Sequence, residues 1–148
     1  MLALVAASYF SDITLTVAMT PSDFVWQGFM QGNKDGCKEW PIEGESTLSW
    51  HGKPLDYMPF VYKHPDYWKV IEQETKGTGN MLCSRKLFND SEKAYNLTEK
   101  EMIKVENICG KLCLIGADDD TLWNTGKYIR RIDERLKKTP HKCDYEVL

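Results

Sequence analysis

Several patterns that would assign a function directly are missing from this sequence of 148 residues. No apolar run approaches the roughly 20 residues that a transmembrane helix needs. The apolar segment Met1–Phe10 has no basic leader and is followed closely by Asp12, so we do not expect a signal peptide. A glycine-rich phosphate loop and a Gly-x-Ser-x-Gly motif are also absent. These absences argue against membrane insertion and nucleotide hydrolysis, and they leave the sequence without a recognisable serine nucleophile.

Strong net charge and paired cysteine motifs are lacking as well. The net charge of −3 gives no electrostatic reason to expect a nucleic acid or an anionic membrane as a partner. Cys109 and Cys113 have no second pair with which to form a zinc site, so we expect no metal and no cofactor. An odd number of cysteines without a secretory context indicates reduced thiols and a cytoplasmic location. The cysteines are residues 37, 83, 109, 113 and 143.

The sequence does contain the alternating helices and strands that are typical of an α/β protein. A hydrophobic content of 42% and a length of 148 residues fit one globular domain. The apolar periodicity predicts helices over Leu2–Phe10, Arg85–Tyr95 and Thr125–Lys138, and strands over Ile13–Met19, Leu112–Ile115 and Lys142–Leu148.

The segment Phe24–Gly79 has many aromatic residues but no helical or strand period, which predicts an irregular segment. Within it, Ser46–Leu55 is typical of a hairpin that turns at His51-Gly52. Further on, Thr98 and Glu101 have the spacing of a capping box, which predicts the start of a short helix.

In the last predicted helix, the spacing of Arg130, Glu134 and Lys138 predicts two ion pairs, Arg130–Glu134 and Glu134–Lys138.

Three consecutive carboxylates, Asp118–Asp120, follow the strand Leu112–Ile115 and precede the last helix. The strand has no polar alternation, which suits a strand buried on both faces of a parallel sheet. The acids therefore lie at the carboxyl edge of the sheet, where open α/β sheets place ligands and catalytic groups. They could cap the helix and solvate the loop, or supply one catalytic or metal-binding carboxylate. Trp123 favours a loop that is ordered and packed.

This arrangement of a strand, Gly-x-x-Asp-Asp-x-x-Trp and a helix resembles the C-terminal part of an α/β-hydrolase. The nearest resemblance is to the family of acyl-CoA thioester hydrolases and bile-acid-CoA:amino acid N-acyltransferases, whose lead-in Val-Glu-Lys-Ile is similar to Val105–Ile108. In that family the triad acid is the second Asp of Asp-Asp-x-x-Trp, which corresponds to Asp120. The extra Asp in this sequence leaves Asp119 as the alternative.

The resemblance implies a partial α/β-hydrolase fold over residues 1–148, with 24–80 as a cap-like loop insertion. Trp26 and Trp123 are then candidates for substrate binding, although aromatic packing explains residues of this kind equally well. It also implies a nucleophile upstream of Met1 and a triad histidine beyond the last strand. The three histidines present, at positions 51, 64 and 141, are expected to be surface or loop residues.

Three functions remain open from the sequence. The first is a fragment of an acyl-CoA thioester hydrolase, acting on an acyl-CoA or ester substrate in the intact enzyme and inactive alone. The second is a degenerate, non-enzymatic binding or assembly module that forms a homo-oligomer through an unpaired sheet edge. The third, a Mg²⁺ site at Asp118–Asp120 for phosphoryl chemistry, is disfavoured because no phosphate loop is present.

Overall fold

The computed structural model describes residues 1–30, 40–63, 65–79 and 81–148. Their contacts divide the chain into two compact units. We call residues 1–24, 102–120 and 125–148 the sheet unit, and residues 25–101 and 121–124 the aromatic unit. The predicted insertion over 24–80 falls almost wholly within the aromatic unit.

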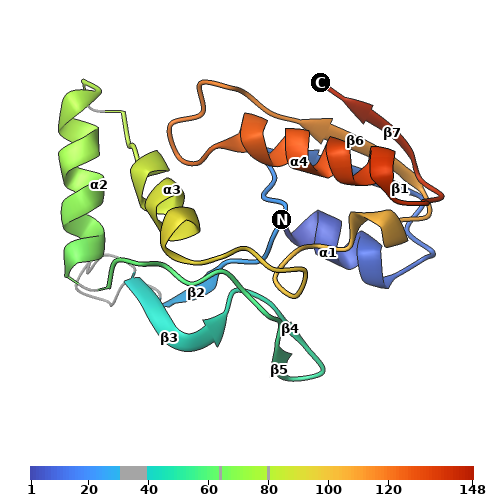
Figure 1. Ribbon diagram of the computed structural model, residues 1–148, viewed down its shortest axis with the longest axis horizontal. Coiled ribbons are helices and arrows are strands. Elements are labelled where there is room, and N and C mark those ends of the chain that lie inside the picture. The colour runs from blue at the N-terminus through green and yellow to red at the C-terminus, as the bar shows by residue number, and fades with distance from the viewer. Residues whose placement is uncertain (31–39, 64, 80) are drawn as a thin grey trace. The chain divides into compact units, whose positions relative to one another are not determined.

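The sheet unit is built on a three-stranded parallel sheet in the order β1-β6-β7 (Figure 1). In its register Val17 lies opposite Cys113, and Cys113 lies opposite Glu146. The predicted strands therefore belong to one parallel sheet, as the α/β interpretation requires. The elements of the unit are α1 (Leu2–Tyr9), β1 (Leu15–Met19), the 3₁₀ helix η1 (Val105–Asn107), β6 (Lys111–Ile115), α4 (Thr125–Lys138) and β7 (Asp144–Val147).

Helix α4 packs on the sheet through an apolar stripe with helical spacing. The hydroxyl of Tyr145, on β7, donates a hydrogen bond of 2.9 Å to Asp133 on α4. At its other end, α4 approaches the end of β6 so closely that a Cβ on Gly116 would lie 2.5 Å from Ile129 Cδ1. The stripe consists of Tyr128, Ile129, Ile132 and Leu136, all buried.

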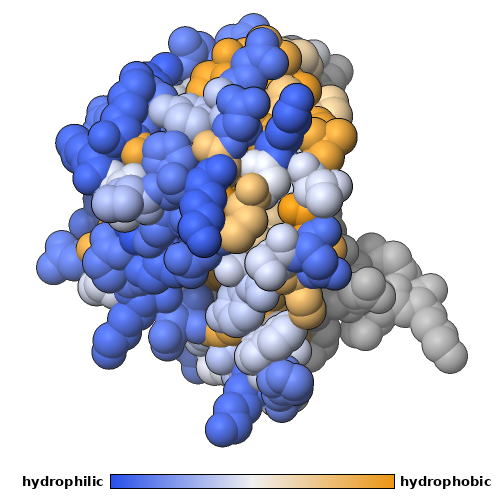
Figure 2. Space-filling view, turned by 90° about the vertical axis from the view of Figure 1, so that its right-hand side faces the viewer, coloured by the Kyte–Doolittle hydropathy of each residue, from blue (hydrophilic) through white to orange (hydrophobic). Residues whose placement is uncertain are grey.

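The other face of the sheet is open. Along β1, Leu15, Val17 and Met19 are 61%, 49% and 69% exposed. The prediction of a strand buried on both faces is wrong for β6, because Leu112 and Leu114 are buried whereas the residues between and after them are only half-buried. Figure 2 shows hydrophobic residues gathered at the top of the face that it draws. The unit thus buries one face of its sheet and leaves an apolar surface on the other.

The aromatic unit has its own core, formed by stacked rings. The ring of Trp26 stacks on Phe60 with a centroid distance of 4.9 Å and meets Phe88 edge-on at 4.7 Å. The elements of the unit are β2 (Gln27–Met30), β3 (Trp40–Ser46), β4 (Ser49–Trp50), β5 (Lys53–Pro54), α2 (Asp66–Gly77) and α3 (Arg85–Ala94). Strands β2 and β3 pair antiparallel, as do β4 and β5.

The prediction that 24–79 is irregular is wrong, since β2, β3 and α2 lie within it. Helix α2 buries Tyr67, Val70 and Ile71, which have helical spacing, but the neighbouring Trp68 and charged residues hid this short stripe in the sequence. The hairpin at His51-Gly52 is confirmed. Both residues have positive φ values, 48° and 76°, which a tight two-residue turn requires.

The capping-box prediction is half right. The backbone N–H of Thr98 donates to the Glu101 carboxylate at 3.2 Å, as a capping box requires. The chain there forms a turn rather than a helix, and the next helical residues are the single 3₁₀ turn η1. The predicted helices Leu2–Phe10, Arg85–Tyr95 and Thr125–Lys138 are confirmed to within one residue.

No helix in the described ranges is long and apolar enough to cross a membrane.

Candidate functional site

The loop between β6 and α4 is fixed by a close approach of the strand to the helix. A Cβ on Gly116 would lie 2.7 Å from Thr125 Cγ2, so a larger residue would crowd the first turn of α4 where the strand ends. The three aspartates follow at once. The loop thus begins at the carboxyl edge of the sheet, as the sequence predicts.

Asp118 is bound to the surface of α4. Its Oδ1 atom lies 2.8 Å from the Arg130 guanidinium, and both side chains are well exposed. The carboxylate also lies directly over Gly126, where a Cβ would meet Asp118 Oδ1. Arg130 therefore pairs with Asp118 instead of its predicted partner Glu134. The second predicted pair, Glu134–Lys138, is present at 3.7 Å.

Asp119 lies at the exposed tip of the loop. Among the described residues it makes no hydrogen bond or ion pair. Its carboxylate is therefore solvated, which matches the interpretation of these acids as loop residues.

Asp120 is held more firmly than its neighbours. Its Oδ2 atom accepts a hydrogen bond from the hydroxyl of Thr125, which is fully buried at the start of α4. The Asp120 side chain itself is only partly exposed. A carboxylate fixed in this way to a helix end is oriented by the fold, whereas the carboxylate of Asp119 is free to rotate.

A second group at the carboxyl edge was not predicted from the sequence. Thr20 follows β1 with a φ of 45° and donates its N–H to the Ile115 carbonyl at 2.7 Å. A positive φ is strained for a β-branched residue. Three residues on, Asp23 is 2% exposed and lies 2.6 Å from the Arg131 guanidinium.

The Arg131 guanidinium also lies over the rings of Phe24 and Tyr128, at 5.2 and 5.1 Å from their centroids. The sequence offered two signals for this pair of residues. An acid precedes the apolar run Phe24–Trp26, and an arginine lies beside the apolar stripe of α4. They were ambiguous because charged residues at such places are usually solvated.

Trp26 and Trp123, the predicted substrate-binding residues, both lie in the aromatic unit. Trp26 is buried in the ring cluster described above. Trp123 is half-buried and meets the Phe88 ring edge-on at 5.5 Å. The loop around it is tied down because the Ser84 hydroxyl donates to the Leu122 carbonyl at 2.7 Å. These contacts support the prediction of an ordered, packed loop, and a role of the two tryptophans in substrate binding stays a prediction.

Within the sheet unit, the described histidine His141 makes no contact with the aspartates. His51 is exposed at the hairpin tip against Trp50. His141 is exposed, with Nδ1 3.0 Å from the Thr139 carbonyl oxygen, and its ring contacts Tyr145. Both are surface or loop residues as predicted, while His64 lies outside the described residues.

Metal ligation finds no support in the geometry. Within the ranges that the structure describes, no group of three or more His, Cys, Asp or Glu side chains is arranged to hold a metal ion. The four described cysteines are free thiols, and Cys37 lies outside the described residues.

The parallel sheet, the helix behind it and an acidic loop at its carboxyl edge define an α/β protein of the α/β-hydrolase class. A comparison with known families identifies the particular one. The model of the family described as "BAAT / Acyl-CoA thioester hydrolase C terminal" matches residues 1–148, so the chain belongs to this family. No curated protein and no solved structure gives a significant match.

Proposed function

We propose that this chain supplies the acid residue of an acyl-transfer site, with Asp120 as that residue and an acyl-CoA or ester as the substrate of the intact enzyme. The observation that carries the proposal is the carboxylate of Asp120, hydrogen-bonded to buried Thr125 at the carboxyl edge of β6 in a chain of this family. The acyl group passes to water or to an amine in this chemistry.

The role of such an acid explains why it has to be held in place. A triad carboxylate accepts the N–H of the catalytic imidazole, fixes its tautomer and stabilises the imidazolium that forms when the nucleophile attacks. The hydrogen bond from Thr125 restrains the Asp120 carboxylate in this way. Since Thr125 begins α4, the position of the acid is set by the packing of a whole helix.

Asp119 is the alternative acid, and a pair of isosteric variants separates the two. The test uses a gene product in which a Gly-x-Ser-x-Gly motif is encoded in frame with this chain, to be sought by sequencing the transcript. There we expect Asp120→Asn to lower kcat on acyl-CoA by about 10⁴-fold, by analogy with the acid of a serine protease triad. Asp119→Asn serves as the matched control and should stay within about threefold of wild type. The reverse order of the two effects would transfer the role to Asp119.

The chain of residues 1–148 by itself should not turn over substrate, because its sequence has no nucleophile elbow. Purified chain mixed with acyl-CoA or p-nitrophenyl esters is expected to match the rate of a protein-free blank. Robust hydrolysis by this chain, absent from a heat-unfolded sample, would disprove the proposal.

A second candidate function is a non-enzymatic assembly module, and the open sheet face favours it. Edge strand β1 presents Leu15, Val17 and Met19 to solvent, and exposed apolar strands at a sheet edge invite pairing with a second copy of the chain. We expect a dimer by light scattering at micromolar concentration. Val17→Lys should give a monomer, whereas the control Met81→Lys, at another exposed apolar residue, should remain dimeric. A wild-type monomer would count against assembly.

We also propose a cytoplasmic location, supported by the free thiols among the described cysteines. Thiol titration of the unfolded chain isolated from its native source should find all five cysteines reduced.

A further inference from the structure

We propose that the aromatic unit contains a binding site for an uncharged planar aromatic ring, such as a nucleobase. The site is a cavity of about 590 Å³ formed by β2, β3, the segment 57–63 and Tyr95. This volume lies within the range of about 300 to 1,000 Å³ that is usual for small-molecule sites. The proposal does not depend on the role of Asp120.

The walls of the cavity are suited to flat rings rather than to alkyl chains. Among its described lining residues there is no Leu, Ile, Val or Met, the side chains that usually surround an acyl chain. Aromatic faces bind other rings by offset or edge-on stacking, and they bind bases of different sequence with similar strength. The apolar lining consists of Tyr57, Phe60, Tyr62, Tyr95, Pro41 and Pro59.

A buried amide joins two walls of the cavity. The side chain of Gln27, 5% exposed, donates from Nε2 to the Ile42 carbonyl at 2.7 Å. Its Oε1 atom accepts the backbone N–H of Phe60 at 2.8 Å. Strand β3 and the segment 57–63 are thereby held at a fixed separation, so the cavity exists before a ligand enters.

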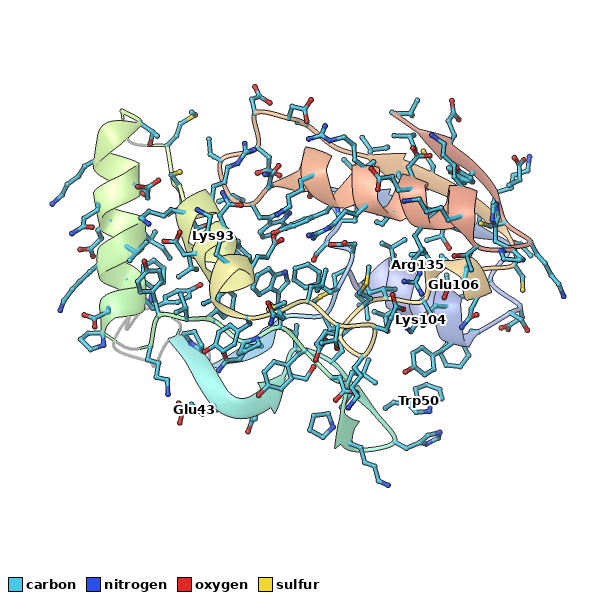
Figure 3. All side chains as sticks on the ribbon, in the orientation of Figure 1. Glu43, Trp50, Lys93, Lys104, Glu106 and Arg135 are labelled. Carbon is cyan, nitrogen blue, oxygen red and sulfur yellow. The ribbon has the colours of Figure 1, made fainter. Side chains whose placement is uncertain are left out.

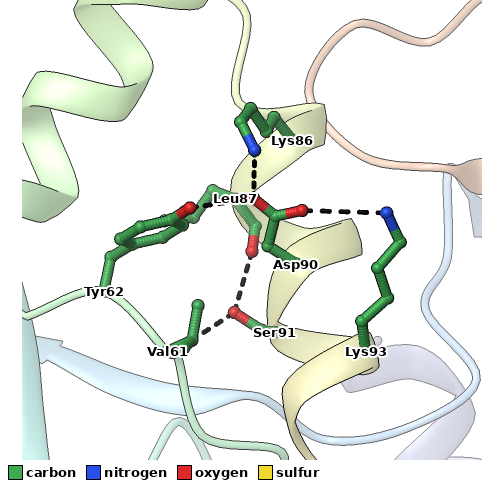
Figure 4. A network of polar contacts seen from close by, with 7 residues as sticks. All are labelled: Val61, Tyr62, Lys86, Leu87, Asp90, Ser91 and Lys93. Carbon is green, nitrogen blue, oxygen red and sulfur yellow. Dashed lines mark hydrogen bonds and ion pairs between the residues drawn. The ribbon is translucent and has the colours of Figure 1, made fainter.

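The ring of Tyr62 is fixed from behind by the network in Figure 4. Its hydroxyl donates to Asp90 at 2.9 Å, and Lys86 contacts the same carboxylate. The backbone N–H of Val61 donates to the Ser91 hydroxyl at 3.1 Å, which attaches the same segment to α3. Two independent contacts therefore hold this part of the lining in place, one through the Tyr62 hydroxyl and one through the Val61 backbone.

The charges at the cavity favour an uncharged ligand. Lys63 and Glu43 line it as an ion pair in which both side chains are 70% exposed. Their charges cancel, so the site attracts neither anions nor cations over distance. A ligand phosphate would gain Lys63 only by separating it from Glu43, and a ligand cation would meet the reverse problem.

The test is calorimetric titration of the whole chain with adenosine as the ring probe. Tyr95 is 38% exposed, so its side chain is replaceable without unfolding. Loss of one stacked ring should weaken adenosine binding about tenfold in Tyr95→Leu. Tyr95→Phe retains the ring and should bind within about twofold of wild type. Far-UV circular dichroism of both variants should match wild type.

Two further titrations use competing ligands. Octanoate represents an alkyl chain, and a proline-rich peptide represents a ligand for aromatic grooves. The proposal expects neither to displace adenosine. It is overturned if adenosine gives no saturable heat up to its solubility limit, if either competitor binds more tightly, or if Tyr95→Phe weakens binding as much as Tyr95→Leu.

Discussion

The ion pair between Arg135 on α4 and Glu106 on η1 should be a principal support of the sheet unit (Figure 3). The guanidinium donates two hydrogen bonds of 2.6 Å, one to each carboxylate oxygen. Each side chain is only 15% exposed. Planar bidentate ion pairs of this kind are stronger than ion pairs with a single hydrogen bond, and their geometry requires arginine.

We expect Arg135→Met to lower the free energy of unfolding by about 3 kcal/mol at pH 7. Removing one partner of a buried pair costs about 3 to 5 kcal/mol, and the residual exposure of Glu106 places this case at the lower end. Such a loss is a large part of the free energy of unfolding of a typical domain, which is roughly 5 to 15 kcal/mol. Arg135→Lys keeps the positive charge but loses the second of the two hydrogen bonds, so we expect about half of that loss.

The pH dependence of this difference provides a second measurement. The pKa of Glu106 is held below its ordinary value, first by the hydrogen bonds from Arg135, while burial acts in the opposite direction. A depressed folded-state pKa gives stability that is fully present above about pH 4.3, the unfolded value, and is lost as the pH falls through the folded pKa. The difference between wild type and Arg135→Met should therefore shrink at pH 3.

The assay has to report on the sheet unit. All tryptophans of the chain, residues 26, 40, 50, 68 and 123, belong to the aromatic unit, so their fluorescence follows that unit. Hydrogen exchange of peptides from α4 in urea follows the sheet unit instead. A loss below about 1 kcal/mol at pH 7, or a difference that stays constant from pH 7 to 3, would refute this account of the pair.

Two other substitutions test the remaining contacts. Gly116→Ala would place its Cβ 2.5 Å from Ile129 and should destabilise the sheet unit by about 1 to 3 kcal/mol in the same hydrogen-exchange measurement, whereas the control Gly77→Ala, with nothing within 4 Å, should be neutral or stabilising for the aromatic unit by tryptophan fluorescence in urea. Equal effects would exclude close packing as the cause. Tyr62→Phe removes the hydrogen bond to Asp90 and should cost about 1 kcal/mol by tryptophan fluorescence in urea. Because Lys86 foremost and Tyr62 lower the pKa of Asp90, the stability that they provide is present above about pH 3.9 and is lost in acid, so Tyr62→Phe should unfold at higher pH. An unchanged acid midpoint would contradict this role of Tyr62.

The elements that the sequence predicted well are those whose pattern is local. Helix Thr125–Lys138 shows an uninterrupted apolar stripe followed by Pro140, and its observed bounds agree with the prediction. The hairpin at His51-Gly52 depends on two residues in positive φ, which a short turn signal reveals. Helix α2 was missed because its stripe is short and lies among aromatic residues.

At the candidate site, the sequence located the acids on a loop after a strand, and the family resemblance favoured Asp120 over Asp119, but no sequence pattern indicated which carboxylate the fold restrains. Asp120 contacts Thr125, and Asp118 contacts Arg130. Neither pair has a spacing along the chain that a helical or strand pattern would reveal. The pair of Asp23 with Arg131 joins residues from separate ends of the sequence, for which no local pattern exists.

The sequence by itself determined the α/β class, the order of strands and helices at both ends of the chain, and the family to which it belongs, because periodicity and motifs are properties of neighbouring residues. Tertiary structure alone decided that one sheet face stays open, that the central aromatic residues form a core of their own with a cavity beside it, and that Asp120 is the restrained acid. Each of these depends on which distant residues meet, and burial and hydrogen bonding between distant residues are settled only when the whole chain folds.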